Sequence, residues 1–236
     1  MAKRRKKRIK WGRVIIALLV FVALAFGIYK GVSFVVSKID LGSIFNEQEA
    51  KNYKATVVID AGHGGVDAGA SNGELLEKDI NLSVAQTIYN ELEEKNIKVI
   101  LTRDDDEALK SEKNQDLIAR AEYSKTYHAD LFVSIHVNDL ENDSSVYGYE
   151  VYYKDKESQS LGNHILDQLD QLNITKNRGL IDGSGLMVLR KNDVKSIILE
   201  LGYIHSQDYD YLNDSKKLDE IAHAISLGIL EELNES

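Results

Sequence analysis

Apolar runs of strand length alternate with longer amphipathic stretches along the chain from about residue 55 onward. The apolar runs are ATVVID, IKVILT and ADLFVSIHV, and the amphipathic stretches between them cover about residues 79–96 and 112–127. In the first amphipathic stretch, apolar residues recur every four positions, as on the buried face of a helix; they are Ile80, Val84, Ile88 and Leu92. This repeated order of strand, helix and strand predicts βαβ units and a parallel sheet.

The second half of the chain continues the pattern. Its apolar runs are GYEVYY, LMVL and SIILELG, an amphipathic stretch covers about residues 158–172, and a last helical stripe contains Leu218, Ile221, Ile225 and Ile229. We count about six strands and four or five helices. The expected fold class is α/β: a single domain over residues 55–234 with a mostly parallel six-stranded sheet flanked by helices. A chain of 236 residues is long enough for one such core plus appendages.

A different pattern precedes this domain. Residues 1–13 contain eight Lys and Arg and no acidic residue, and residues 14–36 are almost entirely apolar. A basic cluster before a span of this length is typical of a transmembrane signal anchor with a cytoplasmic N-terminus. The alternative is a cleaved signal peptide, because Ala23-Leu24-Ala25 offers a small-x-small cleavage site.

We therefore expect an N-terminal transmembrane helix in contact with the membrane, followed by a linker over residues 37–54. The domain that follows would then lie on the extracytoplasmic side of the cell membrane. If the N-terminal segment is cleaved instead, the domain would be secreted.

Composition excludes several classes of function. Because eight of the 29 basic residues lie in residues 1–13, the rest of the chain is strongly acidic and would repel nucleic-acid phosphates. The glycines of GHGG at residues 62–65 are not followed by Lys-Ser or Lys-Thr, so a nucleotide-binding loop is not indicated. Cysteine is absent, so a transition-metal site would have to use His and carboxylate ligands.

Three potential metal ligands lie at the ends of predicted elements. His63 comes three residues after the strand VVID, among glycines that let the backbone turn sharply; Glu77 precedes the first helix; and His136 closes ADLFVSIH. Ligands of open α/β sheets bind beyond the carboxyl ends of the strands. Two imidazoles and one carboxylate are sufficient for a catalytic zinc that keeps one position open. We expect one Zn²⁺ per chain, with Glu74 and Asp67 as alternatives to Glu77.

Two further carboxylates are associated with apolar strands. Glu200 lies within IILEL, where an ionised carboxylate is costly unless it is paired or coordinating. We interpret Glu200 as a general base beside the metal, and the alternative is a structural ion pair with Arg103 or Arg120. Asp60 ends the first strand, where it is placed to accept a hydrogen bond from a ligating imidazole and fix its tautomer.

Six sequence blocks together resemble a known enzyme family. The blocks VVIDAGHGGVDAGA, EKDINL, TRDDD, ADLFVSIHVN, GYEVYY and ILELGYI are similar, in order and spacing, to the zinc-dependent N-acetylmuramoyl-L-alanine amidases of bacterial cell walls. Six ordered blocks are more specific than any single motif. The resemblance implies that His63, Glu77 and His136 are zinc ligands and that Glu200 is the catalytic carboxylate. It also implies that peptidoglycan is the substrate, cleaved between N-acetylmuramic acid and the first L-alanine of the stem peptide.

Some inferences rest on weaker signals. Asn138 and Arg103 match blocks of the family, and we expect them to form hydrogen bonds in the loops or toward the substrate. His205 is a candidate for substrate contact or a substitute ligand. The segment 154–195 is too short for the regulatory helix of some members, so no regulatory protein partner is expected to be required. The alternative functions are another zinc peptidase or amidase acting on wall peptides and a non-catalytic wall-binding module.

Overall fold

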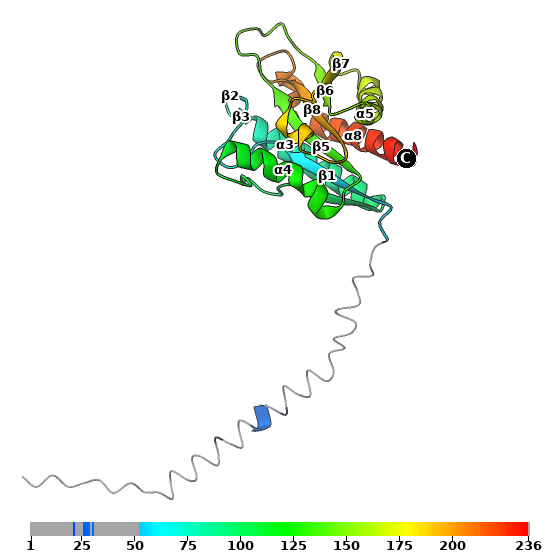
Figure 1. The fold of residues 1–236 in the computed structure, drawn as a ribbon. Helices are drawn as coiled ribbons and strands as arrows, with labels where there is room; N and C mark the ends of the chain where they lie inside the picture. The colour runs from blue at the N-terminus through cyan, green and yellow to red at the C-terminus, as the bar shows by residue number, and fades with distance from the viewer. Residues whose placement is uncertain (1–20, 22–25, 29, 31–51, 236) are drawn as a thin grey trace, which may run out of the picture. The chain divides into compact units, whose positions relative to one another are not determined.

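A computed structural model describes residues 21, 26–28, 30 and 52–235 (Figure 1). Asn52–Ser236 forms a compact unit by itself. The predicted basic segment 1–13 and most of the predicted linker 37–54 lie outside the described residues. The fold is therefore described for the unit that begins at residue 52.

A six-stranded sheet is the centre of this unit, with the strand order β4-β1-β5-β8-β6-β7. Its strands are β1 (Ala55–Ala61), β4 (Ile97–Leu101), β5 (Leu131–Asn138), β6 (Tyr149–Tyr153), β7 (Asn177–Asp182) and β8 (Lys195–Tyr203). A small separate hairpin is formed by β2 (Ser71–Asn72) and β3 (Leu75–Leu76). The helices are α3 (Glu77–Glu94), α4 (Lys113–Tyr127), α5 (Ser158–Leu172), α6 (Met187–Arg190), α7 (Tyr209–Leu212) and α8 (Ser215–Glu235).

The sheet corrects the expected fold class, because it is mixed. β4, β1, β5 and β8 are parallel to one another, but β6 pairs antiparallel with β8, and β7 runs parallel to β6. The reason lies in the link between β5 and β6, residues 139–148, which contains no helix. A parallel return requires a crossover of a dozen or more residues. This shorter link instead brings the chain back in the opposite direction.

The expected transmembrane helix is a second correction. In the part of the chain that the structure describes, every helix falls short of the length or apolar character required to cross a bilayer. The predicted segment 14–36 lies mostly outside the described residues.

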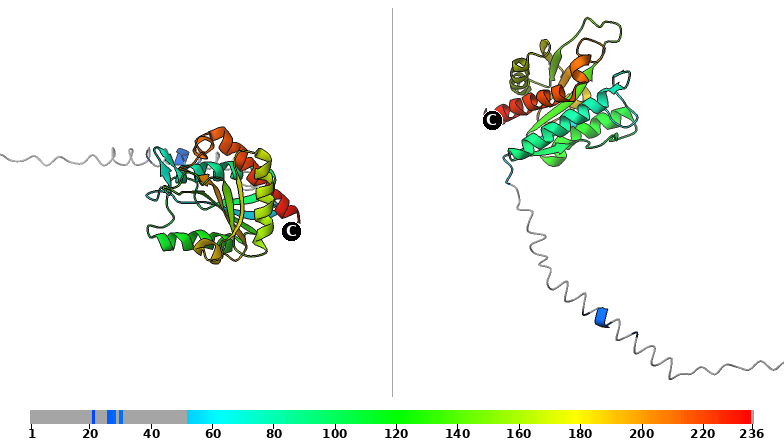
Figure 2. Two further views of the ribbon diagram at one scale, coloured as in Figure 1. Left: turned by 90° about the horizontal axis from the view of Figure 1, so that it is seen from above. Right: turned by 180° about the vertical axis from the view of Figure 1, so that it is seen from behind.

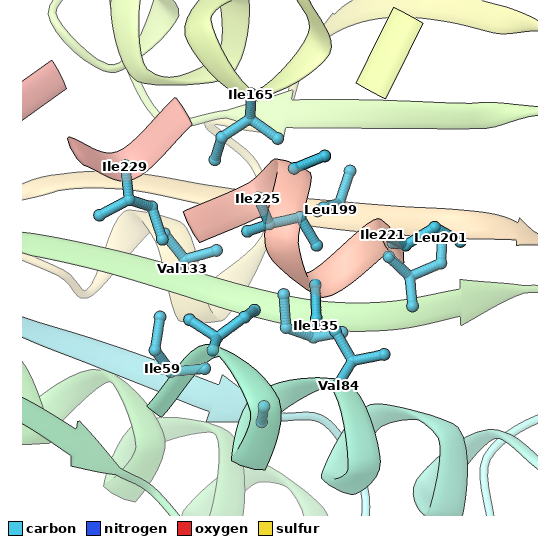
Figure 3. Packing of buried hydrophobic residues seen from close by; sticks show 14 of the residues in the cluster. Ile59, Val84, Val133, Ile135, Ile165, Leu199, Leu201, Ile221, Ile225 and Ile229 are labelled. Atoms are coloured by element: carbon cyan, nitrogen blue, oxygen red, sulfur yellow. The ribbon is translucent and has the colours of Figure 1, made fainter. Parts of the chain in front are cut away.

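Helices cover both faces of the sheet (Figure 2). α3, α5 and α8 pack on one face, and the large core between them and the sheet includes Val133 and Ile135 of β5 (Figure 3). The other face carries α4 and α6, over a smaller cluster that includes Phe132 and Val188. Because side chains alternate along a strand, His136 points to the same face as Phe132. The metal-ligand candidate on β5 thus leaves the sheet on the side of α4 and α6.

The predicted helical stripe on α3 is confirmed. Ile80, Val84, Ile88 and Leu92 are at most 2% exposed, and all belong to the large core. Each such buried aliphatic side chain stabilises the fold by roughly 1.5–3 kcal/mol. This packing fixes α3 on the sheet and with it the position of Glu77, the first residue of the helix.

Five of the six expected strands match strands of the sheet, but the remaining one does not. We count LMVL as a strand, but Met187–Arg190 forms the short helix α6. The sixth strand is β7, whose sequence NRGLID has too few apolar residues to give a strand pattern. β7 is an edge strand with β6 as its single neighbour, and polar residues are tolerated in such strands.

Five chain segments meet at one end of the sheet, which is the margin formed by the strand termini. The carboxyl ends of β1, β5 and β8 lie there because these strands are parallel. The amino end of β6 reaches the same end of the sheet because β6 runs the other way. The start of α3 is joined to this end as well, through a hydrogen bond from the Val137 backbone N–H to Glu77 Oε1 (3.1 Å).

Candidate metal centre

His63, Glu77 and His136 lie together at this end of the sheet. One potential ligand atom from each residue lies within 4.8 Å of the others. Glu77 Oε1 is 2.8 Å from His136 Nδ1 and 3.2 Å from His63 Nε2. The two histidine rings meet edge to face, with centroids 5.0 Å apart. The structure thus brings together the three residues that sequence analysis proposes as ligands.

Two buried arginines shape the loop that carries His63. Arg103 donates to the carbonyls of Ala61 and Gly62, and Arg120 donates to those of Ala61 and His63. His63 itself has φ of +63°, a left-handed conformation that few non-glycine residues adopt. Strain of this kind persists only where the surroundings fix the backbone. The two guanidinium groups provide that restraint by holding three successive carbonyls.

Glycines give the ligands room. A Cβ at Gly62 would lie 2.3 Å from the ring of His136, and one at Gly69 would lie 2.4 Å from Glu77 Oε2. Neither position can accept a side chain without moving a proposed ligand. The absence of a side chain at Gly62 therefore leaves the space that the ring of His136 occupies.

Glu77 is buried and held as a carboxylate. Its Oε2 accepts a hydrogen bond from the Ala70 backbone N–H (2.7 Å), and its Oε1 accepts one from Val137. Burial opposes ionisation, but hydrogen bonds from His136 and His63 outweigh it and hold the pKa of Glu77 far below its usual range. The charge on Glu77 is therefore present at neutral pH.

The same contact shifts the pKa of His136 upward. Burial disfavours the charged imidazolium, but the hydrogen bond and charge of Glu77 outweigh it and raise the pKa of His136 to about 9. Metal ligation requires a neutral imidazole, so a cation binding here would displace this proton.

Glu200 lies beside this cluster. It pairs with His136 across β5 and β8, so the two side chains lie on one face of the sheet. Its Oε2 is a buried atom without a hydrogen-bond partner within the described residues. Burial raises the pKa of Glu200 to about 7. A carboxylate in this state is ready to exchange a proton with a molecule in the site.

Within the described residues, Glu200 does not form the structural ion pair with Arg103 or Arg120 that was considered as an alternative. Arg103 donates to backbone carbonyls, and Arg120 forms ion pairs with Asp60 and Asp116. The two arginines that sequence analysis considered as partners are thus engaged elsewhere. The buried carboxylate of Glu200 is explained better by a role in the site.

The three weaker candidates are placed as follows. Asp60 accepts hydrogen bonds from Thr102, Arg120 and Ser134, so within the described residues its bonds go to these donors and not to an imidazole. Arg103 supports the loop that carries His63. Asn138 Nδ2 donates to Glu150 Oε1 (3.0 Å). Glu150 lies on β6, the strand next to the one that carries Glu200. Asp60, through Arg120, and Arg103 thus support the loop that carries His63, whereas Asn138 holds Glu150.

Asp67 and His205, two other candidates considered from the sequence, each pair with a neighbouring residue. Asp67 Oδ2 lies 2.9 Å from His63 Nδ1, on the far side of the ring from Glu77, so Asp67 orients His63. His205 Nδ1 lies 2.7 Å from Asp139 Oδ1, and His205 is not in the cluster of potential ligands.

The buried carboxylate of Glu150 was not among the residues predicted from the sequence. This residue is 2% exposed and lies directly opposite Glu200 on the neighbouring strand. The signal was available, since a charged residue within the strand YEVYY is as unusual as Glu200 within IILEL.

The donor set fits zinc. Two nitrogens and one carboxylate oxygen, with no thiolate, match the ligands of catalytic zinc sites, which leave one position open for water or substrate. The side chains of His63 and His136 are 20% and 22% exposed, so the cluster can be reached from solvent.

Comparison with known proteins agrees with this geometry. Residues 57–231 match the family described as N-acetylmuramoyl-L-alanine amidase. The germination-specific N-acetylmuramoyl-L-alanine amidase of Bacillus subtilis is 32% identical over 192 residues, covering 76% of this chain and 80% of that protein.

Solved structures give the same result. The amidase AmiC2 of Nostoc punctiforme is 36% identical, with a TM-score of 0.71, covering 77% of this chain and 98% of that one. The CwlD amidase of Clostridioides difficile, solved in complex with the GerS lipoprotein, is 32% identical with a TM-score of 0.71, covering 77% of this chain and 100% of that one. The protein described here therefore belongs to the N-acetylmuramoyl-L-alanine amidase family and is a hydrolase of the amide between N-acetylmuramic acid and L-alanine in peptidoglycan.

Proposed function

We propose that His63, Glu77 and His136 hold one Zn²⁺ ion and that Glu200 is the general base and acid of the amidase reaction. The observation that carries this proposal is the convergence of the three potential ligand atoms within 4.8 Å, next to a buried carboxylate oxygen that has no partner within the described residues. A zinc ion bound there would supply Lewis acidity toward the scissile carbonyl and toward a water molecule.

Glu200 moves the protons of the reaction. Its Oε2 takes a proton from the attacking water as the water oxygen bonds to the carbonyl carbon. The same atom then gives that proton to the alanine nitrogen as the carbon–nitrogen bond breaks. The products are a free carboxyl group on the lactyl ether of muramic acid and a free amino group on L-alanine.

The other residues orient the groups that react. Asp67 fixes the ring of His63, and the backbone N–H groups of Ala70 and Val137 fix the carboxylate of Glu77. Asp60 holds Arg120, which in turn holds the carbonyls of the loop that carries His63. Rigid support of this kind keeps reacting groups in productive geometry.

The test is digestion of purified peptidoglycan by the purified protein, with and without a chelator. We expect mass analysis to show stem peptides with a free N-terminal alanine and glycan strands without peptides. The chelator should stop their release, and added Zn²⁺ should restore it. Cleavage between two stem residues would assign a peptidase activity instead. Full activity in chelator would refute the metal centre.

We also propose that the catalytic domain acts outside the cytoplasmic membrane, because its substrate lies there. Protease added to intact protoplasts should then digest any domain that stays attached to the cell, and a secreted domain should be found in the medium. A domain protected in intact cells and released by lysis would contradict this location.

A further inference from the structure

A row of four charged or ionisable side chains crosses the face of the sheet that carries α4 and α6. His136 on β5 is opposite Glu200 on β8, and Glu200 is opposite Glu150 on β6. The row ends on β7 with Arg178, whose Nε donates to Glu150 Oε2 (2.7 Å). The proposed metal site lies at one end of this row, and a guanidinium group lies at the other.

The carboxylate of Glu150 accepts four hydrogen bonds from side chains. Its Oε1 accepts from Asn138 Nδ2, Tyr152 OH and Tyr203 OH at 3.0–3.1 Å, and its Oε2 accepts from Arg178. It is 2% exposed, so a substrate in the site has no direct access to its carboxylate. Glu150 is therefore a positioning residue and not a second catalytic acid.

The position of Glu150 is nevertheless costly. Like charges directly opposite each other on neighbouring strands are destabilising, and Glu150 faces Glu200 in this way. A fold that keeps both carboxylates must gain something from the second one. What Glu150 holds is Arg178, through a charge-assisted hydrogen bond that fixes one edge of the guanidinium group.

Arg178 is restrained but remains accessible. Its Cζ lies 5.3 Å from the centroid of the Tyr203 ring, which supports the guanidinium from one face. The side chain is 29% exposed, so a ligand can reach it. A planar guanidinium held along one edge, with its terminal nitrogens at the other, is suited to bidentate binding of a carboxylate.

We propose that Arg178 binds a free carboxylate of the stem peptide on the leaving-group side of the scissile amide, and that Glu150 and Tyr203 position it for this contact. The proposal rests on the proposed role of Glu200, because it places the scissile bond beside that residue. The substrate class that it selects is a stem peptide with an unmodified carboxylate near its first alanine.

The distances agree with this assignment. Arg178 is two strands from Glu200, which corresponds to about 9–10 Å between backbones. An extended peptide advances about 3.3–3.6 Å per residue. A carboxylate on the residue after alanine thus lies roughly 7 Å from the scissile bond, within reach of an arginine side chain from β7. In the stem peptide this residue is a glutamate joined through its side chain, which leaves its α-carboxylate free unless it is amidated.

A second basic surface lies on the other side of the cluster. The exposed Lys110 and Lys113 line a cleft of about 370 Å³ that also contains His63 and Val66. No ion pair of either lysine is observed within the described residues, whereas Arg178 is fixed by Glu150 and Tyr203. Exposed lysines without an ion pair attract anions without fixing their orientation. Arg178, held by Glu150 and Tyr203, is suited to orient a bound carboxylate.

The test uses two synthetic muropeptides that differ at a single group, the α-carboxylate of the second stem residue, which is free in one and a carboxamide in the other. We expect the wild-type protein to prefer the free acid in kcat/KM by about ten- to a hundred-fold, the usual effect of a hydrogen-bonded charge pair. Arg178→Gln should reduce this ratio to near one, mainly through KM for the acid. Arg178→Lys should restore part of it.

Two further variants separate the contact from structural and long-range effects. Glu150→Gln should lower the ratio less than Arg178→Gln does, because the guanidinium remains but is no longer held by a charge. Lys113→Gln removes one positive charge on the other side of the cluster and should keep the ratio of the wild-type protein. Thermal unfolding of each variant shows whether it is folded.

The outcomes that overturn the inference are distinct from those that overturn the function. Equal cleavage of both muropeptides by the wild-type protein would refute the role of Arg178 and leave the amidase reaction intact. A loss in Arg178→Gln that is equal for both substrates, or a ratio abolished by Lys113→Gln, would also refute it. Failure of the wild-type protein to cleave either muropeptide or peptidoglycan would instead refute the proposed function.

Discussion

Glu200 and His136 lie side by side on two neighbouring parallel strands, so the buried carboxylate proposed as the general base is carried by the same sheet as a potential metal ligand. A site built on strands keeps its geometry more closely than one built on loops alone. The distance between these two groups is thus set by the spacing of the strands.

Replacing Glu200 by Gln should abolish catalysis and spare the metal. We expect turnover to fall by about 10²–10⁴-fold, because an amide cannot accept the proton of water. Zinc content, measured by elemental analysis, should equal that of the wild-type protein. Loss of the buried carboxylate should leave thermal stability unchanged or raised, since its Oε2 has no hydrogen-bond partner within the described residues. A Glu200→Gln protein that releases stem peptides at the normal rate would contradict the role.

Replacing either histidine of the cluster by Ala should remove the metal. His63→Ala and His136→Ala should each retain much less zinc than the wild-type protein after dialysis, and both should be inactive. His223→Ala is the matched control, because that side chain is 62% exposed and lies on α8, away from the cluster. Equal zinc contents in all three variants would rule out the proposed ligands.

A methyl group at Gly62 should displace a ligand. The new Cβ would lie 2.3 Å from the ring of His136, which must rotate or shift. We expect Gly62→Ala to weaken zinc binding in a competition titration with a chromogenic chelator. Gly185→Ala is the control, since nothing lies within 4 Å of a Cβ at that position. If both variants bind zinc equally well, the close approach is not important.

Breaking the buried pair of Asp60 and Arg120 should destabilise the whole domain. Arg120→Met leaves the carboxylate of Asp60 buried without its cation, which typically costs about 3–5 kcal/mol. The free energy of unfolding in urea measures this loss. Lys217→Met breaks an exposed pair with Glu220 and should cause no measurable change. Equal stabilities of the two variants would show that the buried pair does not support the fold.

The same pair should make stability depend on acid pH. Burial opposes ionisation of Asp60, but Arg120, Ser134 and Thr102 outweigh it and lower the pKa of Asp60 below its ordinary value of 3.8. A depressed pKa stabilises the folded state above the ordinary value, and this stabilisation is lost as the pH falls through the folded-state value. We expect the urea midpoint to drop below about pH 4, and to drop less steeply in Asp60→Asn. Parallel curves would show that other carboxylates cause the loss.

The sequence predicted those parts of the fold where a single pattern decides the outcome. The apolar stripe of α3 and the alternation along β5 each bury one face, so the helix, the strand and the side of the sheet that His136 faces follow from residue spacing. Glu77 was expected just before the helix that this stripe defines and is its first residue. The roles of the site residues were proposed from their positions at the ends of predicted elements and from the resemblance of six sequence blocks to the amidase family.

Other features depend on tertiary context that residue spacing does not encode. β7 is polar and pairs only along one edge, so its strand structure comes from its neighbour β6 and not from its own sequence. LMVL is apolar because α6 packs Val188 onto the sheet, and a run of four apolar residues does not distinguish a short helix from a strand. The partners of Asp60 come from Thr102 just after β4, from α4 and from β5, and a single strand pattern does not identify them.

The reversal of β6 also affects how this enzyme can diversify. Since β5 ends and β6 begins at the same end of the sheet, residues 139–148 lie beside the proposed site and outside the core between the sheet and its helices. Insertions or deletions there would reshape the entrance for long or cross-linked substrates while every strand kept its register. Evolution can therefore alter which wall polymers enter this enzyme by editing one short surface segment, with the chemical machinery left as it is.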